Sequence, residues 1–291
     1  AVDVVVEKPR MAIEVCCGSA RLTKTLGQAG FDAFGIDFKG NKDRPLGPVK
    51  LMDLATKHGQ AEFWKLIEEI WGRIAFVHFA PPCGTASRAR EKRRKLANCQ
   101  ADPVDPLPLR SDTYPDGLPN LGSVAMAKVD AANELYAFSV KAIRFFAKHG
   151  VSWSCENPTN SLMWDTKPFR HLAEDKYSGE FNYSRITMQM CMHGGKRDKK
   201  SDEIFGGPVN FSSLALMCDM SHTHATWGAI RSPAGSISFV TALERNYPYL
   251  YCKRKSRLLA EAFAVVVPSP MNARDRVAAG IQPRRGLGPL L

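Results

Sequence analysis

Cys83 directly follows two prolines in the segment HFAPPCGTASRARE, residues 78–91. A cysteine is a soft nucleophile when its thiol is accessible and partly ionised, and Pro81 and Pro82 restrict the backbone that presents this one. Glu156, in the segment CENPTNS, lies at the end of another expected strand. Cys83 would suit covalent catalysis, and the alternatives are a buried structural thiol at Cys83 and an ordinary turn at Glu156.

Basic side chains are concentrated just after Cys83. The run SRAREKRRK holds six of them, and the whole chain has a formal net charge of +11. An excess of this size favours a polyanionic partner such as nucleic acid, with Arg88, Arg90, Arg93 and Arg94 as the expected phosphate contacts. The alternative is the solvated face of a basic helix.

Three further residues suit the binding of a nucleoside-containing ligand. Gly18 follows an apolar run and would let a ligand approach the backbone, and Asp37 lies 19 residues later, where an acid can bind ribose hydroxyls. Asp53 follows a third apolar segment and could accept a hydrogen bond from an adenine amino group. NAD enzymes and S-adenosylmethionine enzymes share this spacing, but Gly18 is the only glycine of its turn, which favours a ligand without a pyrophosphate. The alternative is that all three are ordinary turn residues.

Alternating apolar patterns place these residues at the ends of strands. Strands are expected at 11–15, 34–37, 73–80 and 151–155, and amphipathic helices at 22–29, 61–71, 128–150 and 249–267. Strands that alternate with helices predict an α/β fold with a mostly parallel sheet covered on both faces. Since ligands bind at the carboxyl ends of such strands, we expect the candidate residues to meet there.

The chain divides into four expected parts. Residues 1–185 form the ligand-binding core, and the proline-rich stretch 96–128 is a loop inserted in it. Short strands over 186–245 predict a small lobe, residues 246–270 a helix that packs back on the core, and 271–291 a flexible basic tail.

Four motifs resemble those of the cytosine-5 DNA methyltransferases, and along the chain they occur in the order typical of that family. The resemblance is closest to divergent phage- or retroelement-type members. APPCGTASRAR resembles the family's Pro-Cys loop, CENPTNS its Glu-Asn-Val motif, and IEVCCGSARLT its cofactor turn, while Asp37 and Asp53 fall where its two cofactor-binding acids lie. The resemblance implies a Rossmann-like class I methyltransferase fold, S-adenosylmethionine as cofactor and DNA as partner. The residues expected to bind the cofactor are Cys17, Gly18, Ser19, Asp37, Phe38, Asp53, Leu54 and Pro81.

The resemblance also implies a mechanism. Cys83 would add to cytosine C6, Glu156 would assist at N3, and the target base would be flipped out of the duplex. Gly84 stands where the family usually has Gln, and CMHGGKRDKKS replaces its Gln-x-Arg-x-Arg motif, so Arg197 or a neighbouring lysine is the expected contact there. Three alternatives stay open, namely an RNA cytosine-5 methyltransferase, an amino-methyltransferase on adenine or cytosine, and a catalytically decayed nucleic-acid-binding module.

The segment CDMSHTHATWG raises the question of a metal site. Cys218, His222 and His224 lie close in sequence, and Cys191 and His193 lie upstream. Cys191, Cys218, His222 and His224 could hold structural zinc, although their spacing matches no standard finger and histidines two apart point to opposite sides of a strand. The alternative is a loop with hydrogen-bonded histidines.

The eight cysteines are scattered, which predicts reduced thiols and an intracellular protein, nuclear if eukaryotic. No apolar stretch approaches the roughly 20 residues of a membrane helix, and the first residues show no secretory signal.

Overall fold

The computed structural model describes residues 9–91, 107–231 and 237–264. Its main sheet has seven strands in the order β3-β2-β1-β4-β5-β7-β6, and only β7 runs antiparallel to its neighbours. The strands are β1 Met11–Val15, β2 Asp32–Asp37, β3 Val49–Leu51, β4 Ile74–Phe79, β5 Ser152–Pro158, β6 Ser184–Gln189 and β7 Lys200–Gly206. The expected Rossmann-like α/β fold with a mostly parallel sheet is therefore confirmed.

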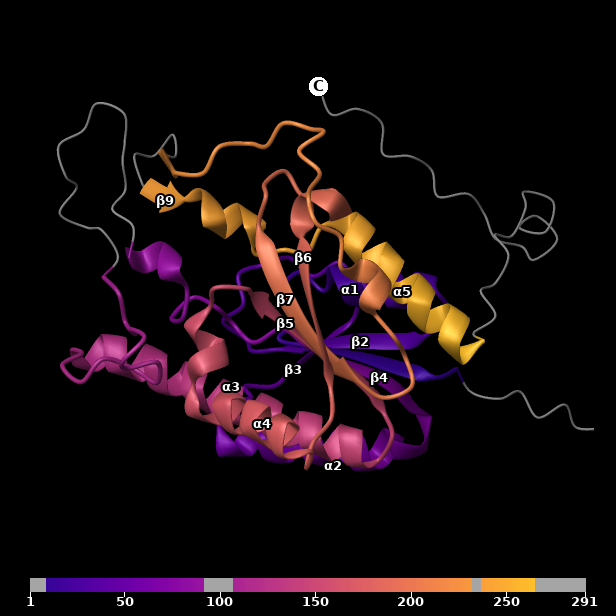
Figure 1. The fold of residues 1–291 in the computed structure, drawn as a ribbon. Coiled ribbons are helices and arrows are strands. Elements are labelled where there is room, and N and C mark those ends of the chain that lie inside the picture. The colour runs from indigo at the N-terminus through magenta and orange to yellow at the C-terminus, as the bar shows by residue number, and fades with distance from the viewer. Residues whose placement is uncertain (1–8, 92–106, 232–236, 265–291) are drawn as a thin grey trace, which may run out of the picture.

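Helices cover both faces of this sheet (Figure 1). On one face lie α2 Lys57–Ile70, α3 Ser123–Lys148 and α4 Lys167–Ser178, and on the other lie α1 Arg21–Gln28 and α5 Tyr249–Phe263. β1 and β4 are buried along their whole length because both of their faces meet a helical layer. Among the helices that the structure describes, none combines the length and the apolar character needed to cross a membrane.

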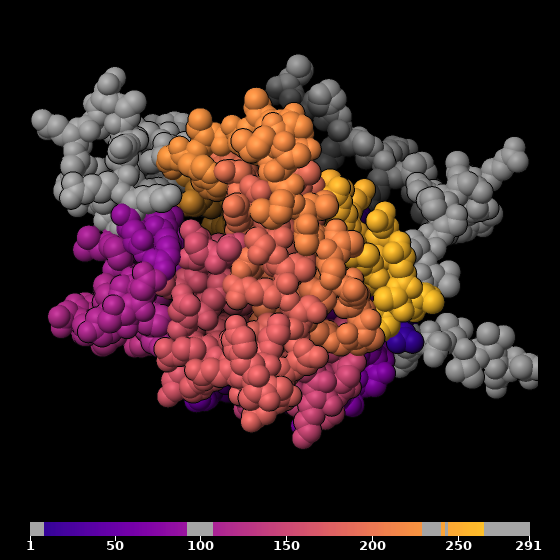
Figure 2. Space-filling model, viewed as in Figure 1, coloured from indigo at the N-terminus to yellow at the C-terminus, as the bar shows by residue number. Residues whose placement is uncertain are grey.

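The expected small lobe over 186–245 is corrected at its start. β6 and β7 pair with each other, and β7 pairs with β5, so residues as far as 206 belong to the main sheet. The sequence showed strand patterns there but not their partners, because pairing depends on long-range contacts. The rest of the expected lobe carries the short pair β8 Ala229–Arg231 and β9 Ile237–Phe239. In Figure 2 the orange residues of this part form the upper edge of the molecule.

Two other boundaries differ from expectation. The expected loop over 96–128 ends earlier, because α3 begins at Ser123; its first turns project from the core and leave Val124 and Met126 exposed, so they lack the apolar stripe that marks a buried helix. Residues 92–106 of that loop lie outside the described residues, as do 265–270 of the expected C-terminal helix and the tail 271–291. α5 packs beside α1, where Ser256 and Thr25 share a hydrogen bond of 2.8 Å.

Candidate active site

A cavity of about 910 Å³ opens at the carboxyl ends of the strands. The turn after β1, the loop after β4 and the end of β5 supply three of its walls, as expected for a parallel sheet. The stretch before β7 and the residues before α5 supply the fourth. The lining includes Glu14, Cys17, Gly18, Ser19, Pro81, Cys83, Glu156, Lys199, Trp227, Glu244 and Tyr247. The cavity thus joins the expected cofactor turn to the expected catalytic residues.

The loop that carries Cys83 is fixed on both sides of the cysteine. The side-chain amide of Asn157 donates to the Pro81 carbonyl oxygen, and the Tyr136 hydroxyl donates to the Pro82 carbonyl oxygen, each at 2.8 Å. The backbone N–H of Ala86 donates to the Cys83 carbonyl oxygen at 3.0 Å. Proline cannot donate from its own backbone, so these three bonds position a segment that could form few of its own.

The Cys83 thiol is partly buried and lies between opposite charges. Burial raises its pKa above the ordinary value, Lys199 lowers it, and Glu156 raises it. Both charged residues lie across the cavity from the loop after β4. Cys83 is therefore largely a thiol until another positive charge enters the cavity or its proton is taken up.

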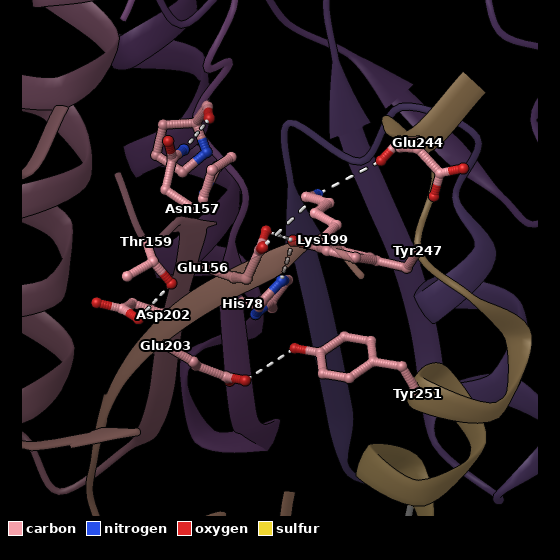
Figure 3. Close-up of polar contacts among 12 residues, drawn as sticks. His78, Glu156, Asn157, Thr159, Lys199, Asp202, Glu203, Glu244, Tyr247 and Tyr251 are labelled. Atoms are coloured by element: carbon pink, nitrogen blue, oxygen red, sulfur yellow. Dashed lines mark hydrogen bonds and ion pairs between the residues drawn. The ribbon is translucent and has the colours of Figure 1, made fainter. Parts of the chain in front are cut away.

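Glu156 offers one free oxygen to the cavity. Its side chain is only 5% exposed, and the Tyr247 hydroxyl donates to Oε2 at 2.9 Å. Oε1 is buried, has no hydrogen-bond partner among the described residues, and lies 4.0 Å from Lys199 Nζ (Figure 3). An unpaired buried acceptor is costly, so Oε1 is the atom through which this carboxyl group would meet a ligand.

Tyr247 contacts a series of buried polar side chains that begins with His78 and continues to Lys255. His78 Nε2 lies 2.9 Å from the Tyr247 hydroxyl, and Lys255 Nζ lies 3.2 Å from His78 Nδ1. Burial and the nearby Lys255 hold the pKa of His78 well below its usual value, so the ring is neutral. When Lys255, which is paired with Glu203, donates to Nδ1, the ring hydrogen lies on Nε2 and is donated to the Tyr247 oxygen. Tyr247 is then left to donate its own proton to Glu156.

The turn after β1 has the backbone expected of a ligand-binding turn. Gly18 has φ +52°, a conformation that side chains rarely adopt, and its N–H donates to Asp37 Oδ2 at 2.8 Å. The other Asp37 oxygen accepts from the Phe38 N–H at 2.8 Å. Burial raises the pKa of Asp37, while these two hydrogen bonds act in the opposite direction. Cys17 and Ser19 are buried in the same turn.

Pro81 lines the cavity, whereas the expected cofactor residues Phe38, Leu54 and Asp53 lie away from its lining. The Phe38 ring is half exposed, and Leu54 is buried in the core against α2. Asp53 is exposed after β3, and its Oδ1 accepts from the Ala55 N–H at 3.1 Å. Asp37 connects to the cavity through Gly18, whereas no described contact joins Asp53 to it.

Arg197, the basic residue expected to contact the base or its loop, is bound to neighbouring residues. Its guanidinium donates to Glu244 Oε1 at 2.5 Å and to the Thr226 carbonyl oxygen at 3.0 Å, and it does not line the cavity. Lys199, two residues later, is the cation that faces Glu156 and Cys83. Lys199 is one of the lysines that neighbour Arg197 in the segment CMHGGKRDKKS.

The arginines after Cys83 have intramolecular partners. Arg88 pairs with Asp112 and Glu91, and Arg90 donates to the Gly84 carbonyl oxygen at 2.7 Å. Both line the rim of the cavity, so they stand where a polyanion would pass, but they also hold the segment around residue 112. Arg93 and Arg94 lie outside the described residues.

The four expected metal ligands do come together. One ligand atom from each of Cys191, Cys218, His222 and His224 lies within 4.8 Å of the others. Residues 218–224 form no strand, so the expected opposition of the two histidines does not arise. His193 is not part of the cluster, since its Nε2 bonds the Leu214 carbonyl oxygen at 3.0 Å.

Tyr247 and His78 contact the candidate site although no sequence pattern indicated them. Tyr247 is 91 residues from Glu156, and no local pattern joins them. A histidine inside the apolar strand VHF was the one visible signal, because a buried ring requires polar partners.

Comparison with known proteins gives likenesses of fold. No family model matches the chain, and no curated protein matches it in sequence. A DNA modification methyltransferase encoded within an E. coli prophage has a TM-score of 0.43 and 14% identity, over 76% of this chain and 60% of that one. The S. pombe Dnmt2 methyltransferase has a TM-score of 0.39 and 10% identity, over 75% of this chain and 58% of that one. The Entamoeba histolytica methyltransferase EhMeth has a TM-score of 0.37 and 12% identity, over 75% of this chain and 58% of that one. The chain thus spans at most 60% of the length of these similar structures.

Proposed function

We propose that this chain is an S-adenosylmethionine-dependent methyltransferase that makes 5-methylcytosine in DNA. One observation carries the proposal: the Cys83 thiol and the unpaired Oε1 of Glu156 face the same cavity, which also contains the Gly18 turn. A nucleophile, an acid and a cofactor turn at three strand ends form a constellation suited to covalent catalysis.

The reaction assigns one bond change to each group. The Cys83 thiol releases its proton to solvent and its sulfur forms a bond to cytosine C6, while the proton of Glu156 passes to N3, which makes C5 electron-rich. C5 then attacks the methyl group of the donor, and the donor sulfur keeps the electron pair of the S–CH3 bond that breaks. The C5 proton passes to solvent, the electron pair of that C–H bond restores the C5–C6 double bond and expels the Cys83 sulfur as a thiolate, and the N3 proton returns to Glu156.

Tyr247 determines which oxygen of Glu156 takes part. Its hydroxyl occupies Oε2, so the transferable proton belongs on Oε1, the oxygen without a partner. Lys199 Nζ, 4.0 Å from Oε1, favours the carboxylate once the proton has moved to the base, and it also favours the Cys83 thiolate. Lys199 therefore stabilises the charges that develop as the adduct forms.

The turn after β1 fits the nucleoside part of the methyl donor, which supplies an electrophilic methyl group when bound. Each Asp37 oxygen accepts one backbone N–H, and a carboxylate oxygen has a second lone pair that can accept from a ribose hydroxyl. The Gly18 conformation keeps this backbone open, and Pro81 lies on the opposite wall. Cys17, Ser19 and Phe38 would border the ligand, and Asp53 and Leu54 would lie at its far end.

DNA is the substrate that the charge favours. The net charge of +11 suits a polyanion, and Arg88 and Arg90 line the rim through which a base would enter. Because the cavity is recessed, the cytosine must leave the helical stack to reach Cys83.

Covalent trapping tests the proposal. A duplex containing 5-fluorocytosine has no C5 proton to lose, so the wild-type protein should form a stable adduct with it in the presence of S-adenosylmethionine. Cys83→Ala should form none and should still bind the cofactor by calorimetry. Adduct formation by Cys83→Ala, or trapping only on an RNA of the same sequence, would overturn the mechanism or the substrate respectively.

A further inference from the structure

The strongest unassigned feature outside the cavity is the cluster of Cys191, Cys218, His222 and His224. Cys191 is buried in the turn that follows β6, while the other three belong to the segment 215–228, which contains no helix or strand. Two thiols and two imidazoles point at one another although 33 residues separate the first ligand from the last. We propose that these four side chains bind a structural zinc ion.

The distances among Cys218, His222 and His224 match three edges of a tetrahedral metal site. Cys218 Sγ lies 3.8 Å from His222 Nε2 and 3.5 Å from His224 Nε2, and the two Nε2 atoms are 3.1 Å apart. Zinc bonds of about 2.3 Å to sulfur and about 2.0–2.1 Å to nitrogen imply tetrahedral edges of about 3.5 Å for S–N and about 3.3 Å for N–N. A hydrogen bond between the two imidazoles would explain one of these pairs and leave the convergence of both thiols unexplained.

The backbone around Cys218 is arranged as it is around a metal-bound thiolate. The Met220 N–H points at Cys218 Sγ at 3.3 Å, and Met220 adopts φ 60°, a left-handed conformation that turns this N–H inward. Such N–H donors stabilise the negative charge of a thiolate ligand. The strained conformation of a non-glycine residue also needs a compensating interaction, which a metal bond at Cys218 supplies.

A zinc ion at this site would hold the segment 215–228 in place beside the wall of the cavity. Gln189 at the end of β6 holds the segment at its start, since its N–H donates to the Leu216 carbonyl oxygen and its Oε1 accepts from the Cys218 N–H. At the other end Trp227 Nε1 donates to Asp198 Oδ1 at 2.7 Å, and both residues line the cavity. The segment itself exposes Met217 and Met220 and packs few apolar side chains, so zinc would supply the cohesion that a core supplies elsewhere.

The first test is the metal content of the purified chain. The chain, purified under reducing conditions and dialysed free of loose metal, should contain one zinc per molecule by mass spectrometry. Cys218→Ser and His224→Ala should lose it. Two matched controls, Cys83→Ala in the cavity and His171→Ala on exposed α4, should keep it, because they remove the same ligand types elsewhere.

Cobalt binding by the wild-type protein keeps the test independent of variants that fail to fold. Cobalt(II) added to the metal-free protein should give the visible bands of tetrahedral coordination and a near-ultraviolet band from thiolate, and Cys83→Ala should give the same spectrum. Zinc removal should lower the thermal midpoint of the wild type and leave that of Cys218→Ser unchanged. Zinc-free protein that takes up no cobalt, or a Cys191–Cys218 disulfide found under the same reducing conditions, would overturn the site. This result does not depend on whether the chain transfers methyl groups.

Discussion

The Tyr247 hydroxyl donates a 2.9 Å hydrogen bond to Glu156 Oε2 and accepts one from the His78 ring. One wall of the cavity thereby orients the acid that belongs to another wall. The bond leaves Oε1 as the carboxyl oxygen without a hydrogen-bond partner among the described residues, so the direction in which Glu156 acts depends on a residue that lies just before α5.

Replacing Tyr247 by Phe should remove this orientation while leaving the fold intact. A hydrogen bond to a charged group contributes about 1.5–3 kcal/mol, which corresponds to a loss of about 10- to 100-fold in kcat. The loss should fall on kcat rather than on KM, because the change alters the orientation of Glu156. Tyr249→Phe is the matched control, since its hydroxyl bonds Gln28 on the surface. Equal rates for the two variants would show that Tyr247 does not position Glu156.

Lys199→Met should make the Cys83 thiol harder to ionise. Lys199 lowers the pKa of Cys83 against the effects of burial and of Glu156, so its removal should move the pKa upward. The rate of alkylation of Cys83 by iodoacetamide, followed against pH by mass spectrometry, should rise at a higher pH than in the wild type. Lys196→Met, at an exposed position outside the cavity lining, should leave the profile unchanged. A Lys199→Met profile that coincides with the wild type would contradict the electrostatic role.

Asn157→Ala should destabilise the loop that presents Cys83. The change leaves the buried Pro81 carbonyl oxygen without its donor, which costs about 1–3 kcal/mol of unfolding free energy. Urea denaturation measures this value. Asn210→Ala, at an exposed turn, should change it by about 0.5 kcal/mol or less. A stability loss no larger than that of the control would mean that the loop is held by other contacts.

Glu14 should give the stability of the protein a pH dependence of its own. Burial raises its pKa to about 7 from 4.5, while hydrogen bonds from Thr23 act against this. The folded state therefore binds this proton more tightly, so the stabilisation is fully present below pH 4.5 and is lost as the pH rises to about 7. The loss is on the order of 3 kcal/mol.

Glu14→Gln should remove that slope, because its amide oxygen can still accept from the Thr23 N–H and hydroxyl. Denaturation midpoints measured between pH 4.5 and 8 test this. Glu134→Gln, on the exposed face of α3, should retain the wild-type dependence. An unchanged slope in Glu14→Gln would assign the dependence to another group.

Local sequence patterns predicted most strands of the main sheet and several of the residues that line the cavity. Apolar runs located β1, β4 and β5, and the rule that parallel strands end at one edge brought Cys83, Glu156 and Gly18 together. The same patterns could not show that β6 and β7 extend the main sheet, because a strand pattern does not name its partner. Tyr247 could not be predicted for a similar reason, because it meets Glu156 through a contact across the fold. Lys199 was only one of several lysines expected beside Arg197, and its contact with Glu156 is likewise long-range.

The convergence of the four candidate metal ligands also depends on contacts that local sequence patterns do not show. The residue types suggested zinc, but the spacing matches no standard finger, and two histidines two residues apart would point to opposite sides of a strand. The segment is irregular, and the bonds from Gln189 to Leu216 and Cys218 are what bring it to Cys191.

Identification of the methylated nucleoside tests the central claim most directly. DNA incubated with the wild-type protein and S-adenosylmethionine carrying a labelled methyl group would be digested to nucleosides and analysed by mass spectrometry and chromatography. The account predicts labelled 5-methylcytosine from the wild type and none from Cys83→Ala. Labelled N4-methylcytosine or N6-methyladenine, or 5-methylcytosine made equally well by Cys83→Ala, would contradict it.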